Sequence, residues 1–167
     1  MQRAEKRIPK GDWSGPAVDT VVLTHHDRHR RRVRMQGSNG TSFVLNLARA
    51  TVFRDGDGLM LDDGRMIAVK AATEPLLEIT CDDPVHLARI AWHIGNRHLS
   101  AEIDGGRILI AEDHVIGDMV KGLGANVRSV EEPFDPEGGA YGDGGGGHHH
   151  DGDHDHPHHH HHHGSHG

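Results

Sequence analysis

The sequence is poor in cysteine and in long apolar runs, and each shortage excludes a class of protein. A single Cys among 167 residues excludes a disulfide framework and a zinc site built from several thiolates. No run approaches the ~20 apolar residues that a membrane-spanning helix needs. The charged start, MQRAEKRIPKGDW, lacks the apolar stretch of a secretion signal. These shortages predict a soluble, cytoplasmic protein that is not bound to a membrane.

The sequence also lacks an excess of basic residues. It contains 18 Lys and Arg against 25 Asp and Glu, a net charge of −7, and four of the Asp residues lie in the last thirty positions. A weakly acidic body argues against a dedicated nucleic-acid-binding protein. The arginine run from Arg28 to Arg34 is therefore interpreted as the solvated face of a strand, with a nucleic-acid-binding surface as the less favoured alternative.

Motifs of the common catalytic sites are missing as well. The chain has no G-x-S-x-G motif, its Gly-rich runs lack the Lys-Ser/Thr pair of a phosphate-binding loop, and no obvious base follows or precedes Cys81. We therefore expect Cys81 to be a small, buried or half-buried apolar residue. The sequence predicts that the protein is not an enzyme.

What the chain has in abundance lies at its C-terminal end. Residues 138–167 contain 12 His, 10 Gly and 4 Asp, and no Leu, Ile, Val, Phe, Met, Lys or Arg. A segment with so little apolar surface cannot offset the entropy lost on ordering. We therefore predict a disordered, metal-binding tail over residues 136–167, and a folded body of about 137 residues, which is enough for one domain or two small ones.

Residues 1–75 show the pattern of short strands separated by turns. Phe43, Leu45 and Leu47 alternate along one face of an extended segment. The Asp63-Gly64 turn joins the apolar segments GLML and RMIAVKAA into a hairpin. This pattern predicts a small all-β domain.

Residues 76–135 have a different pattern, in which strands alternate with two helices. Asp83 and Pro84 begin the first helix as N-cap and first residue, and Asp113 caps the second. The resulting order, β-α-β-β-α-β, is that of a ferredoxin-like domain, so the predicted fold class is α+β. The apolar stripes expected to face the sheet are Leu87, Ile90, Ala91 and Ile94 in the first helix, and Val115, Met119 and Leu123 in the second.

Two histidines of the body are candidate metal ligands. His98 follows Gly95-Asn96-Arg97 just beyond the first helix, where a loop can present an imidazole to a partner. His114 lies in the first turn of the second helix, where the helix dipole disfavours the imidazolium form, and Glu112 beside it is a possible oxygen ligand. The remaining body histidines are interpreted as solvated or boundary residues: His25, His26, His29, His86 and His93.

The tail is the strongest sign of metal binding. Imidazoles that are largely neutral near pH 7 bind Ni, Cu, Zn or Co, and a flexible chain gathers several of them around an ion with high capacity and little selectivity. The final HHHHHHGSHG is also typical of a purification tag, whereas the preceding HHHDGDHDHP is not. The candidate ligands of the tail are His148, His149, His150, His154, His156, His158, His159, His160, His161, His162, His163 and His166.

These segments together resemble the family of the urease accessory protein UreE. The resemblance rests on AWHIGNRHLSAEI, followed by EDHVIGDMVKGLGANV, and on the segment Ala71-Ala72-Thr73-Glu74 before the second domain. The segment EPFDPEGGAYG and the His-rich end also match, so the resemblance covers essentially the whole chain.

The resemblance implies a dimeric nickel metallochaperone with a peptide-binding-like first domain and a ferredoxin-like metal-binding domain. His98 from each of two protomers would hold one ion on the two-fold axis. His114 corresponds to a peripheral ligand of some members, and Glu112 stands where those members have a second His. The implied partners are the urease apoprotein and its accessory complex, including the GTPase UreG.

Two functional hypotheses follow from these observations. The first is delivery of Ni²⁺ to urease, with His98 as the transfer ligand and the tail as the collector of ions. The second is general storage or buffering of Ni, Zn or Cu by the tail alone. Nickel rests on the resemblance, because imidazole chemistry by itself ranks Cu(II) above Ni(II) and would also admit Zn(II).

Overall fold

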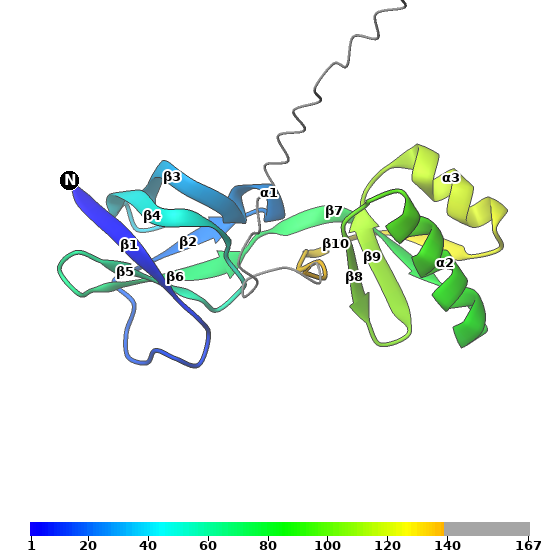
Figure 1. Ribbon diagram of the computed structural model, residues 1–167, viewed down its shortest axis with the longest axis horizontal. Coiled ribbons are helices and arrows are strands. Elements are labelled where there is room, and N and C mark those ends of the chain that lie inside the picture. Colours follow the sequence, from blue (N-terminus) through cyan, green and yellow to red (C-terminus); the bar gives the residue numbers. More distant parts are fainter. Residues whose placement is uncertain (139–167) are drawn as a thin grey trace, which may run out of the picture.

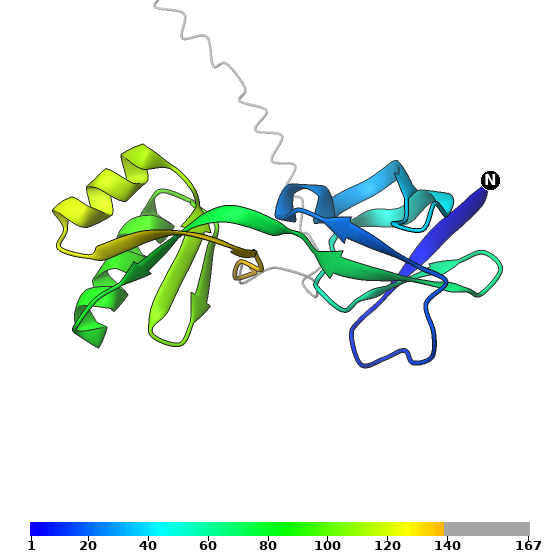
Figure 2. The ribbon, with the colours of Figure 1, turned by 180° about the vertical axis from the view of Figure 1, so that it is seen from behind.

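The computed structural model describes residues 1–138, which form two β-sheets in succession. In both views the sheets lie side by side along the long axis, and one strand runs from the first towards the second (Figures 1 and 2). The elements of the first part are β1 (Gln2–Ile8), β2 (Asp19–Leu23), α1 (His25–Arg28), β3 (His29–Gln36), β4 (Ser42–Val52), β5 (Gly58–Leu61) and β6 (Met66–Ala71). Those of the second are β7 (Thr73–Thr80), α2 (Pro84–Asn96), β8 (Ala101–Asp104), β9 (Arg107–Ala111), α3 (His114–Gly122) and β10 (Asn126–Pro133).

The first sheet has six strands in the order β2-β6-β5-β1-β4-β3. The alternation of Phe43, Leu45 and Leu47 is confirmed, because all three side chains are buried in the core of this sheet. The hairpin of β5 and β6 is also as predicted. Strand β1 was not predicted, although it lies between β5 and β4.

Strand β1 escaped prediction because its own sequence carries little strand signal. Of its seven residues only Ala4 is buried, and most of the others are charged. Its backbone pairs with β5 on one side and with β4 on the other, so partners distant in sequence hold it in place.

The second sheet has four strands in the order β10-β7-β9-β8, and every neighbouring pair is antiparallel. This order and the helices α2 and α3 make the domain ferredoxin-like, as the sequence predicted. Both helices lie at the outer end of the molecule, on one side of the sheet (Figure 1). The second sheet begins at Thr73, just before the boundary expected near residue 75.

Helix α2 forms as its sequence predicts. The Asp83 carboxylate accepts a hydrogen bond from the Val85 N–H, and Pro84 occupies the first turn. Ile90 and Ile94 are buried against the sheet, with Leu87 and Ala91 packed beside them. The half-buried Cys81 joins the same cluster, as expected of a small apolar residue.

Helix α3 forms where predicted, but the expected buried stripe is wrong at two of its three residues, since only Met119 packs against the core. Val115 is 61% exposed and Leu123 38% exposed. The helix instead turns Val120 and Gly117 towards the sheet, with Ile116 and Met119 packed at the margin. The sequence has apolar residues on two adjacent faces of this helix, and only its packing against β7 and β10 selects one of them.

Arg28 was expected to be solvated, and the structure overturns this interpretation. Its side chain is 0% exposed and donates hydrogen bonds to the backbone oxygens of Phe53 and Phe134. Arg28 ends helix α1 and does not belong to strand β3. Because Phe134 follows the last strand of the second sheet, Arg28 joins the two halves of the chain by contacts additional to the covalent link between β6 and β7.

Within residues 1–138, no helix is long and apolar enough to cross a membrane. The tail residues 139–167, which hold the candidate ligands between His148 and His166, lie outside the part of the chain that the structure describes.

Candidate metal centre

His98 is exposed at the C-terminal end of helix α2 and has a left-handed backbone, with φ of 57°. Its N–H donates to the Gly95 oxygen at 3.0 Å, and the Leu99 N–H donates to the Ile94 oxygen. This is the usual C-terminal turn of a helix, in which glycine normally occupies the left-handed position. His98 is the only non-glycine residue with positive φ within residues 1–138. A strained position of this kind occurs more often at functional sites than elsewhere.

The side chain of His98 borders an open hollow of about 410 Å³ between helix α2 and strand β8. Ala91 and Ile103 supply apolar walls, and Glu137 lies at the same hollow. The Glu137 N–H donates to the Ala101 oxygen at 2.7 Å, and a Glu137 carboxylate oxygen accepts a hydrogen bond from the Ile103 N–H. The chain after β10 therefore returns to the His98 hollow. Sequence reasoning missed Glu137, because thirty-nine positions separate it from His98 and no local pattern connects them.

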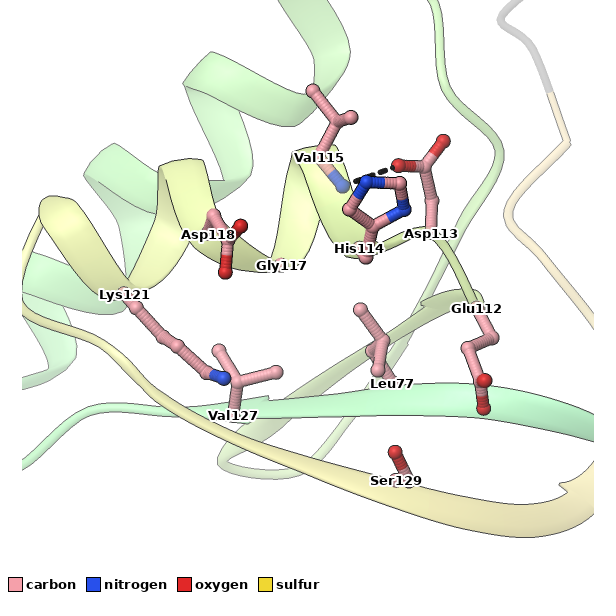
Figure 3. A pocket seen from close by; sticks show the side chains of 10 residues that line it. All are labelled: Leu77, Glu112, Asp113, His114, Val115, Gly117, Asp118, Lys121, Val127 and Ser129. Atoms are coloured by element: carbon pink, nitrogen blue, oxygen red, sulfur yellow. Dashed lines mark hydrogen bonds between the residues drawn. The ribbon is translucent and has the colours of Figure 1, made fainter.

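His114 and Glu112 border a different hollow, of about 570 Å³, at the start of helix α3. Asp113 caps this helix, its carboxylate accepting hydrogen bonds from the Val115 and Ile116 N–H groups. Figure 3 shows the imidazole of His114 beside Asp113, whereas the Glu112 carboxylate points towards strands β7 and β10. The structure thus places His114 and Glu112 in one hollow without directing them at a common point.

Among residues 1–138, no three His, Cys, Asp or Glu side chains come close enough together to hold a metal ion. His98 and His114 border separate hollows. An ion bound at His98 would therefore need further ligands from outside the described residues of one chain. An exposed imidazole at a rigid helix end, open on one side, suits such a shared site.

Two other histidines of the body, His86 and His93, make contacts within the second domain. His86 Nε2 lies 2.6 Å from the Leu123 oxygen. The ring of His93 meets that of Trp92 edge-on, with 5.1 Å between centroids. These contacts agree with the interpretation of both as boundary residues at the margin of the helices.

His25 differs from the expectation that it is exposed. It is half-buried, its ring meets Phe134 edge-on at 5.4 Å, and its backbone N–H donates to the Glu74 carboxylate. Burial lowers the pKa of His25, and the nearby Arg28 guanidinium lowers it further. His25 therefore belongs to the contact between the two halves of the chain.

Comparison with known proteins finds similarity over most of the chain. Residues 74–166 match the family described as "UreE urease accessory protein, C-terminal domain", and residues 4–72 match its N-terminal domain. Three relatives are each named "Urease accessory protein UreE". That of Rhodopseudomonas palustris (strain HaA2) is 57% identical over 141 residues, which are 84% of this chain and 66% of the relative.

The other two relatives match over more of their own length. That of Beijerinckia indica is 51% identical over 145 residues, 87% of this chain and 84% of the relative. That of Rhodobacter capsulatus is 44% identical over 144 residues, 86% and 89% of the two chains. The chain spans just under two thirds of the R. palustris relative. Both domains and these identities show that the chain belongs to the urease accessory protein UreE family.

Proposed function

We propose that this protein is a nickel metallochaperone that delivers Ni²⁺ during assembly of the urease active site. The family consists of accessory proteins of urease maturation, which makes the chain a chaperone and not an enzyme. The observation that carries the nickel proposal is the exposed His98, held in a left-handed turn outside any group of three or more His, Cys, Asp or Glu side chains among residues 1–138.

The proposed site is shared between two copies of the chain. One imidazole binds an ion weakly, and a two-fold axis doubles the number of ligands at no cost in sequence. His98 from each protomer would hold the ion, and imidazole is a suitable ligand for Ni²⁺. An exposed shared site also suits a protein that must release its cargo, because no deep cavity has to open.

The tail and the second hollow have supporting roles in this proposal. The tail histidines from His148 to His166 would collect ions and raise their concentration near His98. His114, with Glu112 as a possible oxygen donor, would bind a further ion more weakly. The ion would pass to the urease apoprotein within its accessory complex, which includes the GTPase UreG.

Nickel titration by calorimetry, with molecular mass measured in parallel, tests this function. The full-length protein should show one tight step at one ion per dimer, followed by weaker steps. His98→Ala should abolish the tight step and leave the weak capacity of the tail intact. A full-length variant with all twelve tail histidines replaced by Gln should keep the tight step.

The alternative of storage through the tail alone predicts the opposite result. Replacing the tail histidines would then abolish all binding, and His98→Ala would leave the titration unchanged. Retention of one Ni²⁺ per dimer without the tail histidines therefore decides between the two functions.

A further inference from the structure

The two halves of the body carry opposite net charge. Residues 1–72 contain thirteen Lys and Arg against eight Asp and Glu, whereas residues 73–138 contain five against thirteen. The weak net charge of the whole body therefore hides a cationic first domain joined to an acidic second domain. Such an asymmetry directs each half towards different partners.

The positive charge of the first domain is concentrated on three neighbouring strands. β3, β4 and β1 are adjacent at one side of the first sheet, where β3 is the edge strand (Figure 1). Glu5 is the only carboxylate in these three strands. Their cations are Arg3, Lys6, Arg7, Arg30, Arg31, Arg32, Arg34 and Arg49.

Strand register places several of these cations on the outer face of the sheet. Val44 of β4 pairs with Arg34 of β3 on one side and with Arg3 of β1 on the other. The next residue of β4, Leu45, is buried, so the row through Val44 points away from the core. Arg34 and Arg3 are exposed at the two ends of this row.

Two further exposed cations flank that row. Arg32 lies two residues before Arg34 on β3 and pairs with Asn46, and Lys6 pairs with Met60 on the other side of β1. The four side chains, which we call the cationic face, are Arg3, Lys6, Arg32 and Arg34.

The cationic face is not neutralised within the described part of the chain. None of its four side chains forms an ion pair with a carboxylate of residues 1–138. By contrast, Arg30 pairs with Asp27 at 3.0 Å and Arg54 with Asp135 at 2.7 Å. A sheet surface with arginines unpaired within residues 1–138 on either side of Val44 has the composition of a protein–protein interface, in which Arg is enriched.

We propose that the cationic face is a docking surface for an acidic protein surface of the urease maturation machinery, a proposal that rests on the proposed function. Charge complementarity would steer the partner to the first domain and away from the acidic second domain. The nickel site at His98 lies on that second domain, so docking through the cationic face would leave the site open for transfer.

Two other occupants are less favoured by the charges. A nucleic acid is an extended polyanion, and the adjacent acidic domain would repel it. The tail of the same chain has four Asp residues, but its twelve His are partly protonated near pH 7 and offset that charge. An acidic patch on a folded protein is limited in extent, so it can meet the cationic face without extending over the acidic domain.

Fluorescence anisotropy of a labelled Glu-rich peptide, added to the full-length protein at low salt, tests the proposal. Replacing Arg3, Arg32 and Arg34 together by Gln should weaken binding by about tenfold or more, since three unpaired charges are lost from one surface. The matched control replaces Arg65, Arg89 and Lys121 by Gln, which removes the same charge from exposed positions elsewhere. The control should bind the peptide within about twofold of the unaltered protein.

Several outcomes would overturn the proposal. These are no binding of the peptide, equal weakening in both triple variants, or tighter binding of a labelled single-stranded RNA that the cationic-face variant loses. Tighter peptide binding after Asp143, Asp151, Asp153 and Asp155 are changed to Asn would assign the face to the tail instead. Nickel titration of the same triple variant should be unchanged, so a failure of docking is distinguishable from a failure of the nickel site.

Discussion

His98 has a backbone conformation that an L-amino acid with a side chain rarely adopts, and its position at the end of helix α2 explains why. The helix ends in a turn that needs a left-handed residue, and Gly95 lies three positions too early to supply it. Left-handed backbone costs a side-chain-bearing residue about 1–2 kcal/mol relative to right-handed helix. The strained position is therefore occupied by the residue to which the proposed function assigns the tight nickel site.

The cost of His98 leads to a prediction in which stability and function change in opposite directions. His98→Gly should raise the free energy of unfolding by up to about 1 kcal/mol, because Gly adopts the left-handed turn without strain. The same change should abolish the tight nickel step. Urea unfolding combined with calorimetry measures both effects, and His98→Ala, which keeps the strain, is the control that should lose nickel without gaining stability.

His25 predicts a pH dependence of stability, because burial lowers its pKa from 6.5 and Arg28 lowers it further. As the pH falls below 6.5, the unfolded chain takes up a proton at His25 while the folded protein still holds the ring neutral. Stability at this position is therefore fully present above pH 6.5 and is lost as the pH falls towards the folded pKa.

Unfolding of a His25→Gln variant across this pH range measures the effect. The variant should lose part of the decline in stability that the unaltered protein shows between pH 7 and pH 5. His26→Gln changes an exposed neighbouring side chain and should keep the decline. Identical slopes for all three proteins would show that His25 is not the group responsible.

At the scale of single elements, helix α3 shows how a sequence pattern can indicate a helix and still leave its orientation undecided. Val115 and Leu123 lie on one apolar stripe of the helix. Ile116 and Val120 lie on a second stripe, which is offset from the first by the rotation of about one residue around the helix axis. Gly117 is buried, and a Cβ there would lie 3.1 Å from Leu77. The absence of a side chain at Gly117 lets this face of the helix approach the sheet closely.

The orientation of α3 predicts unequal effects of two matched substitutions. Val120→Ala should lower the free energy of unfolding by about 2 kcal/mol, because it removes two methyl groups from a fully buried site. Val115→Ala should change it by less than about 0.5 kcal/mol, because that side chain is mostly exposed. Similar losses in urea unfolding would mean that the helix is rotated from the described position.

At the scale of the whole molecule, the two domains are joined by more than the covalent link between β6 and β7. Arg28 binds backbone oxygens of both halves, and its guanidinium lies 3.9 Å from the Asp135 carboxylate. Its Nε atom has no hydrogen-bond partner within residues 1–138. Burial lowers the pKa of Arg28, and nearby carboxylates, led by Asp135, oppose the shift. We expect this contact to hold the domains as one cooperative unit.

Loss of Arg28 should therefore uncouple the domains. Arg28→Met should lower the free energy of unfolding by about 2–4 kcal/mol, because two buried carbonyl oxygens lose their donor. It should also separate one unfolding transition into two. Trp13 lies in the first domain and Trp92 in the second, so Trp92→Phe and Trp13→Phe variants report each domain by fluorescence.

The control for this prediction lies two residues away. Arg30 forms a part-exposed ion pair with Asp27, and Arg30→Met should change stability by no more than about 1 kcal/mol. It should leave the two fluorescence transitions coincident. Coincident transitions in the Arg28→Met variant as well would contradict the joining role of Arg28.

The single cysteine was enough to exclude a disulfide framework and a zinc site of several thiolates within the chain. The alternation at Phe43, Leu45 and Leu47, the cap at Asp83 and the order of elements in the second domain were enough to predict a small β domain followed by a ferredoxin-like domain. Their local propensities agree with the fold, and the resemblance of the chain to a known family is confirmed by both domain matches.

Only the tertiary structure decided the features that depend on partners distant in sequence. Strand β1 forms because β4 and β5 pair with it, Arg28 is buried because Phe134 returns to it, and α3 selects its face against the sheet. The cationic face likewise appears only when β3, β4 and β1 are placed side by side. Sequence patterns report what a segment favours by itself, whereas burial and register follow from contacts that no local pattern contains.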